Sequence, residues 1–146
     1  MILEIRNSIL KKLGKIADEN NYRIFVVGGY VRDLILGKED NDIDIMVLGD
    51  GIKFAELAAK LAGGKLDAVY KNFETALMNT DDMKIEFASA RKESYERSSR
   101  KPKVETASLE EDLSRRDFTI NAFAVGLNKD NYGELTDIFN GYNDIQ

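Results

Sequence analysis

The 146-residue chain contains no cysteine, no histidine, no tryptophan and one proline, Pro102. Without cysteine it forms no disulfide and no thiolate zinc site. The absence of both cysteine and histidine also excludes the Cys–His and Ser–His pairs of nucleophilic catalysis. Carboxylate oxygens are therefore the obvious metal ligands that remain, and they suit Mg²⁺, with Mn²⁺ as the alternative.

The chain also lacks any run of 18 apolar residues, so it has no candidate transmembrane helix. Its first 16 residues interleave acids and bases with aliphatic residues, unlike a signal peptide. A hydrophobic content of 43% is enough for a core, and the length predicts one domain. We expect a cytoplasmic protein with no membrane partner, and the sequence makes no prediction of its oligomeric state.

The net charge of the chain is −5, but positive charge gathers in one segment. Residues 91–103 hold six basic residues against Glu93 and Glu96, a local net charge of +4; the six are Arg91, Lys92, Arg97, Arg100, Lys101 and Lys103. A patch of this kind can meet phosphate groups. A solvated loop explains the same composition, and both interpretations stay open at this point.

Hydrophobic periodicity predicts an α+β domain. Helical spacing from Ile2 to Ala17 predicts a first amphipathic helix, and a capping box at Ser108 predicts a late one. The polar segment 94–107 carries the proline and is expected to be a loop. Further helices are expected at 30–36 and 51–62, with a helical turn at 117–122, and strands at 23–27, 42–48, 65–70, 74–79, 83–90, 123–127 and 135–139. This order favours a mixed, mostly antiparallel sheet with helices packed on one side.

Asp42 and Asp44 alternate along the apolar segment DIDIMVL. On a strand, residues two apart leave the same face, and two adjacent carboxylates repel unless a cation lies between them. A Mg²⁺ pair bound there would bridge the protein to a nucleoside triphosphate. An acidic strand edge is the plainer alternative for this pattern alone. A calcium-binding EF-hand loop starting at Asp40 is excluded, because Ile45 and Gly51 stand where glycine and glutamate are required.

A glycine pair, Gly28 and Gly29, follows an apolar strand and opens a helix. Missing side chains let a phosphate approach the backbone N–H groups there, and Arg32, one turn into the helix, is within reach of the same phosphates. The segment is neither a P-loop nor a GxGxxG fingerprint. A simple strand-to-helix turn also explains the two glycines.

Two further motifs contain charged candidates. Glu86 lies in the alternating segment KIEFASA and supplies a third carboxylate if its strand neighbours the aspartates; otherwise it is an ordinary strand residue. Arg115 and Arg116 precede Asp117. Paired arginines hold a triphosphate or stack on a base, although a surface ion pair fits the motif equally well.

Taken in order, GGYVRD, DIDIMV, IEFASARKESY, RKPKVE, LEEDLSRRDFTINAFA and LTDIFNGYNDI closely resemble the head domain of class II tRNA nucleotidyltransferases and bacterial poly(A) polymerases. The resemblance covers roughly residues 20–146 and implies the polymerase-beta-like fold. It also implies site residues: Asp42 and Asp44 as catalytic metal ligands, Glu86 as a further catalytic carboxylate, and Gly28, Gly29, Arg32 and Arg116 as nucleotide contacts. Segment 91–108 resembles the family's flexible loop, with Arg91, Arg97, Arg100, Lys101 and Lys103 as candidate RNA contacts.

The activity that this resemblance implies is Mg²⁺-dependent, template-independent nucleotidyl transfer from CTP or ATP to an RNA 3′-hydroxyl. The segment YKNFETALM looks more like the CCA-adding members, which favours tRNA 3′-CCA addition. The alternatives are a poly(A) polymerase, a CC-only or A-only enzyme, a non-catalytic nucleotide- or RNA-binding module, and a small-molecule nucleotidyltransferase. Family members continue into neck, body and tail domains. Residues 1–146 are therefore expected to be the head domain of a longer protein.

Overall fold

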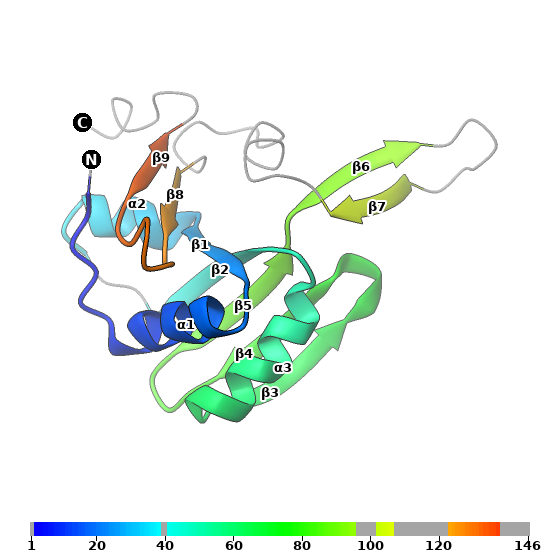
Figure 1. Ribbon diagram of the computed structural model, residues 1–146, viewed down its shortest axis with the longest axis horizontal. Coiled ribbons are helices and arrows are strands. Elements are labelled where there is room, and N and C mark those ends of the chain that lie inside the picture. The colour runs from blue at the N-terminus through cyan, green and yellow to red at the C-terminus, as the bar shows by residue number, and fades with distance from the viewer. Residues whose placement is uncertain (1, 39–40, 96–101, 107–122, 138–146) are drawn as a thin grey trace.

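The computed structural model describes residues 2–38, 41–95, 102–106 and 123–137 (Figure 1). The helices are α1 (Ser8–Glu19), α2 (Gly29–Ile35) and α3 (Gly51–Ala62), with a short 3₁₀ turn η1 (Lys71–Phe73). The strands are β1 (Arg23–Val27), β2 (Asp42–Leu48), β3 (Lys65–Tyr70), β4 (Thr75–Asn79), β5 (Lys84–Ser89), β6 (Arg91–Tyr95), β7 (Pro102–Thr106), β8 (Phe123–Gly126) and β9 (Leu135–Asp137). None of the described helices combines the length and apolar character needed to cross a membrane.

Seven strands form one sheet in the order β3-β4-β5-β2-β1-β8-β9. Every neighbouring pair is antiparallel except β2 and β5, which run parallel in the middle of the sheet. Parallel neighbours need a long crossover, and here α3, β3 and β4 supply it. The expected mixed, mostly antiparallel sheet is confirmed.

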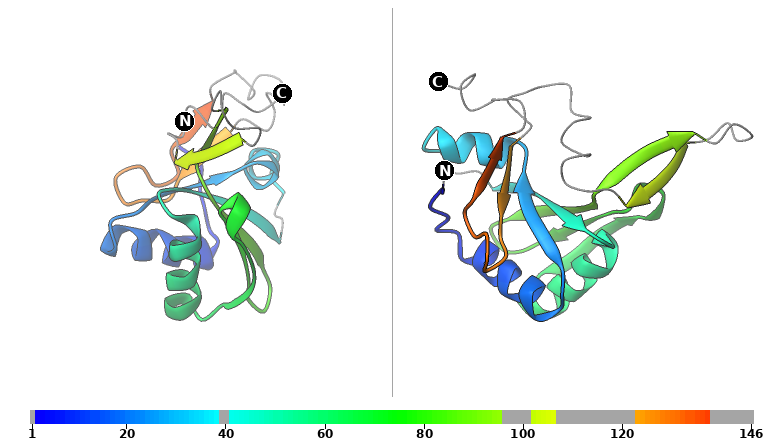
Figure 2. Two further views of the ribbon diagram at one scale, coloured as in Figure 1. Left: turned by 90° about the vertical axis from the view of Figure 1, so that its right-hand side faces the viewer. Right: turned by 45° about the horizontal axis from the view of Figure 1, so that its top comes forward.

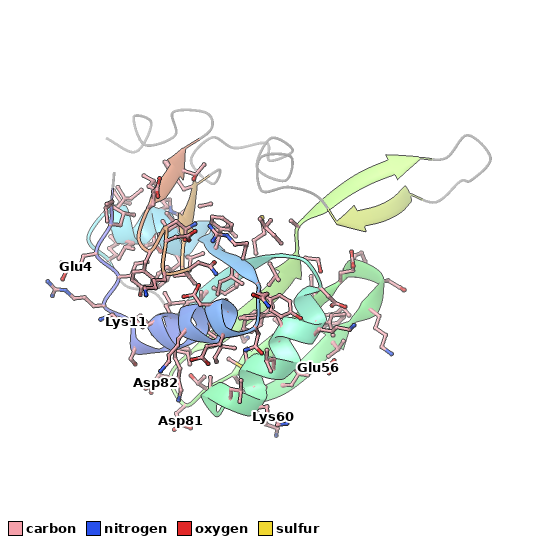
Figure 3. The ribbon with its side chains drawn as sticks, in the orientation of Figure 1. Glu4, Lys11, Glu56, Lys60, Asp81 and Asp82 are labelled. Atoms are coloured by element: carbon pink, nitrogen blue, oxygen red, sulfur yellow. The ribbon has the colours of Figure 1, made fainter. Side chains whose placement is uncertain are left out.

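The two faces of the sheet are different. Alternating apolar residues from β1, β2, β5 and β8 pack with α1 and α3 into one large core that includes Phe54 and Phe87. Helix α2 adds Tyr30 and Val31 to the same core. Figures 1 and 2 show α1 and α3 side by side on that face. Figure 3 labels three exposed residues of these helices, Lys11 on α1 and Glu56 and Lys60 on α3. The opposite face carries a smaller apolar cluster around Phe25, Val27 and Met46 beside its polar residues.

The first helix is shorter than its hydrophobic pattern predicts. It begins at Ser8, because the side-chain oxygen of Asn7 accepts hydrogen bonds from the N–H groups of Ile9 and Leu10 and caps it. The preceding segment is not helical. There the N–H of Leu3 donates to the backbone oxygen of Gly133 at 2.7 Å. Apolar spacing alone did not separate the helix from this segment.

The polar segment 94–107 is not simply a loop. Strands β6 and β7 pair in antiparallel register from Arg91 opposite Thr106 to Tyr95 opposite Pro102, and the hairpin projects away from the main sheet (Figure 1). Pro102 is compatible with this pairing because it is the first residue of its strand. A proline at the first residue of a strand does not prevent the strand from forming, so the presence of Pro102 alone did not indicate a loop.

The other central elements follow the sequence prediction closely. Strands β1 and β2 and helix α3 have the expected bounds. Asp50 caps the start of α3, and Gly63 ends it in a left-handed conformation. The predicted late helix from Ser108 and the helical turn at 117–122 lie outside the described residues.

Gly14 marks a close contact between α1 and Leu127, the residue that follows β8. A Cβ atom at this position would overlap the backbone oxygen of Leu127. A backbone atom cannot move aside as the end of a flexible side chain can. We expect Gly14→Ala to lower the free energy of unfolding by about 1–3 kcal/mol through overpacking. Urea unfolding measures this, with the exposed neighbour Lys15→Ala as control. Equal stability of the two variants would contradict the close contact.

Candidate active site

Strand β2 presents two carboxylates on one face of the sheet. Asp42 and Asp44 are exposed, whereas Ile43 and Ile45 between and after them are only 1% exposed in the core. The strand therefore divides its side chains as its sequence predicts, with apolar residues inward and acidic residues outward. Both aspartates lie on the face opposite α1 and α3.

The parallel pairing of β2 with β5 brings a third carboxylate to the same place. Glu86 is in register with Asp44, and Lys84 is in register with Asp42. These four side chains line an open hollow of about 330 Å³, together with Ile43 and Leu77. The predicted neighbourhood of Glu86 is thus present. Lys84 was not predicted, although the alternation that places Glu86 on this face also places Lys84 there.

The glycine turn lies directly against this carboxylate group. Val27, the last residue of β1, pairs with Asp44, and Gly28 follows it with φ at +75°. A Cβ atom on Gly28 would lie 3.4 Å from Oδ2 of Asp44. Only glycine adopts this backbone conformation without strain, so the residue type and the close approach have the same explanation.

Arg32 brings a positive charge to the glycine turn. Its Nη2 lies 3.5 Å from where a Cβ of Gly29 would be, so the guanidinium folds back over the start of α2. Its Nε donates to Oδ1 of Asp33 at 3.3 Å, and its side chain stays 37% exposed. The predicted residues Gly28, Gly29, Arg32, Asp42, Asp44 and Glu86 therefore gather in one region.

These residues fit a magnesium ion that shares its coordination with a substrate. Within the described ranges, no three acidic side chains converge tightly enough to hold a metal without other ligands. Mg²⁺ commonly takes one or two protein carboxylates and completes its octahedron with water and substrate phosphates. Two exposed aspartates on one strand face supply that donor set.

Six other predicted residues are not tested by this geometry. Arg116, Arg97, Arg100 and Lys101 lie outside the described residues. Arg91 begins β6, and Lys103 lies on β7 opposite Ser94. Their backbone positions place both on the hairpin that projects from the sheet, and their roles remain predictions.

The fold is that of a polymerase-beta-like nucleotidyltransferase head domain, with acidic residues on neighbouring parallel strands behind a glycine turn. The family model described as the poly A polymerase head domain matches residues 24–146, and the chain belongs to this family.

Named relatives support this assignment. The chain is 45% identical over 139 residues to an A-adding tRNA nucleotidyltransferase of Geobacter sulfurreducens, a match that covers 95% of this chain and 16% of the relative. It is 47% identical over 124 residues to the enzyme of the same name from Aquifex aeolicus, covering 85% of this chain and 15% of the relative. The chain thus spans about a sixth of these two relatives.

A solved structure gives the same result in three dimensions. A tRNA nucleotidyltransferase complexed with a primer tRNA and an incoming ATP analogue superposes with a TM-score of 0.77 at 43% sequence identity. The match covers 91% of this chain and 36% of that structure. Sequence and fold therefore agree on the family.

Proposed function

We propose that this chain is a catalytic head domain that transfers a nucleoside monophosphate from CTP or ATP to the 3′-hydroxyl of a tRNA. The observation that carries the proposal is the meeting of Asp42, Asp44 and Glu86 beside Gly28 on one open sheet face. Membership of the head-domain family and the likeness to a nucleotidyltransferase bound to primer tRNA and an ATP analogue support it.

Each residue has a role that follows from its position. Asp42 and Asp44 would hold Mg²⁺, and Glu86 would add negative charge beside Asp44. Arg32 pairs with phosphate oxygens, and the backbone at Gly28 and Gly29 lets the triphosphate approach closely. Bound Mg²⁺ would neutralise charge on the phosphates and make the attacking hydroxyl more acidic. The side chains of the site bind the two substrates and align them for the reaction.

Which nucleotides are added is a separate question. The sequence favours complete CCA addition through its YKNFETALM segment, whereas the relatives from Geobacter sulfurreducens and Aquifex aeolicus are named A-adding enzymes. Transfer of AMP alone to a tRNA ending in CC is therefore the second candidate. Both reactions use the same phosphate and metal site, and they differ in the choice of base.

The proposed site favours similar affinity for CTP and ATP, because the roles assigned to its charged residues are contacts with phosphates and metal rather than with a base. Calorimetry of the 146-residue chain with Mg²⁺ and each triphosphate tests this. We expect dissociation constants within about tenfold of each other and no binding in EDTA. Labelling of tRNA transcripts that end before or after CC then identifies the transferred nucleotides. Metal-independent triphosphate binding, or no labelling of either transcript, would contradict the proposal.

A further inference from the structure

An exposed aromatic surface lies at the η1 end of β3. Among the described residues, Val69, Tyr70 and Phe73 are large hydrophobic side chains that are 37%, 50% and 61% exposed, and they are close together in the chain. With Lys71 and Asn72 they line a hollow of about 380 Å³. Single exposed apolar residues need no explanation, but two aromatic rings beside a lysine in one hollow are a more specific arrangement.

A β-bulge turns Tyr70 toward the catalytic face. Leu66 pairs with the fully buried Met78 and packs on the core side of the sheet. The register then shifts between Leu66 and Ala68, so that Ala68 pairs with Leu77 and Tyr70 pairs with Thr75. Without this shift, Leu66 and Tyr70 would share a face. Bulges of this kind re-aim side chains and are frequent beside active sites.

The strand register also relates Tyr70 to the carboxylates. Leu77 pairs with Glu86, and Glu86 is in register with Asp44, so all three lie on the face toward which Tyr70 points. Three strand spacings across and two residues along give a separation of roughly 16 Å between Tyr70 and Asp44. A few nucleotides of extended single strand cover such a distance.

We propose that Tyr70 and Phe73 form a stacking platform for bases of the single-stranded RNA that leads to the reacting 3′-hydroxyl, with Lys71 pairing with its backbone phosphate. This inference rests on the proposed function, because it assigns a binding site to the acceptor strand of that reaction. Single-stranded nucleic acid binds where aromatic rings take the bases and cations follow the backbone. RNA fits better than a protein partner, because Lys71 lines the same hollow as the two rings and because the platform shares the face of the carboxylates.

Fluorescence anisotropy of the 146-residue chain with a labelled ten-nucleotide RNA ending in CC tests the platform. We expect Tyr70→Ala and Phe73→Ala each to weaken binding roughly tenfold through lost stacking, and Tyr70→Phe to retain it. Leu61→Ala removes an exposed apolar side chain from α3 on the other face and should change nothing. Thermal unfolding midpoints and Mg²⁺-dependent ATP affinity should be unchanged in all four variants.

An abasic nucleotide placed at each position of the RNA in turn identifies the stacked base. At that position, the abasic change and Tyr70→Ala should not be additive, because both remove the same contact. The inference is overturned if the wild-type chain binds no RNA, or if the Tyr70→Ala/Phe73→Ala double variant binds it within twofold of the wild type. The inference is also overturned if a protein partner binds the wild type but not the double variant, while both proteins bind RNA with the same affinity. If the wild-type chain shows no Mg²⁺-dependent triphosphate binding, that result refutes the catalytic proposal instead.

Discussion

Asp44→Asn is expected to reduce nucleotidyl transfer by at least about a thousandfold. The asparagine keeps the size of the side chain but removes the negative charge that the proposed Mg²⁺ site needs, beside Gly28 and Glu86. A bound metal supplies several kcal/mol of transition-state stabilisation, and each 1.36 kcal/mol is a tenfold change in rate. Asp42→Asn, on the same face of β2, should have an effect of similar size.

Single-turnover incorporation of labelled nucleotide into tRNA measures these rates. Asp67→Asn is the matched control, because Asp67 is an exposed aspartate on a strand of the same sheet but does not line the carboxylate hollow. We expect that variant to transfer nucleotide at the wild-type rate. Calorimetry with Mg²⁺ and ATP should show the metal dependence of binding lost in the Asp42→Asn/Asp44→Asn pair. If the double variant still transfers nucleotide, neither aspartate is a ligand of the catalytic metal.

Phe54→Ala is expected to lower the free energy of unfolding by about 3–5 kcal/mol, the usual cost of deleting a buried aromatic ring. Phe54 is fully buried on α3, and its ring centroid lies 5.0 Å from that of Tyr22 and 5.7 Å from that of Phe87. It therefore joins α3 both to β5 and to the segment before β1. Its loss leaves a cavity under the strands that carry the carboxylates.

Urea unfolding at constant pH measures this loss. Phe73→Ala is the control, since it removes the same ring from a position that is 61% exposed, and we expect its stability to stay within about 0.5 kcal/mol of the wild type. A similar loss in both variants would show that the core around Phe54 is not packed as described.

Parts of the fold that depend on local pattern were predictable. Strands β1 and β2 and helix α3 have the expected bounds, because each combines a clear period with an explicit start or stop signal such as Asp50 or Gly63. The predicted start of α1 was wrong, because Ile2 and Ile5 continue the helical spacing through a segment that is not helical. Asn7 caps the helix and separates it from that segment. Strands β6 and β7 were missed because their pairing is not visible in either strand alone.

The sequence by itself determined that Asp42 and Asp44 share a face, because alternation along a strand is a local property of the backbone. Tertiary structure decided which residues meet them. Glu86 and Lys84 reach the aspartates through the parallel pairing of β2 with β5, and Tyr70 reaches their face through the bulge in β3. Pairing partners and register depend on contacts between segments far apart in the chain, and one-dimensional spacing does not encode them.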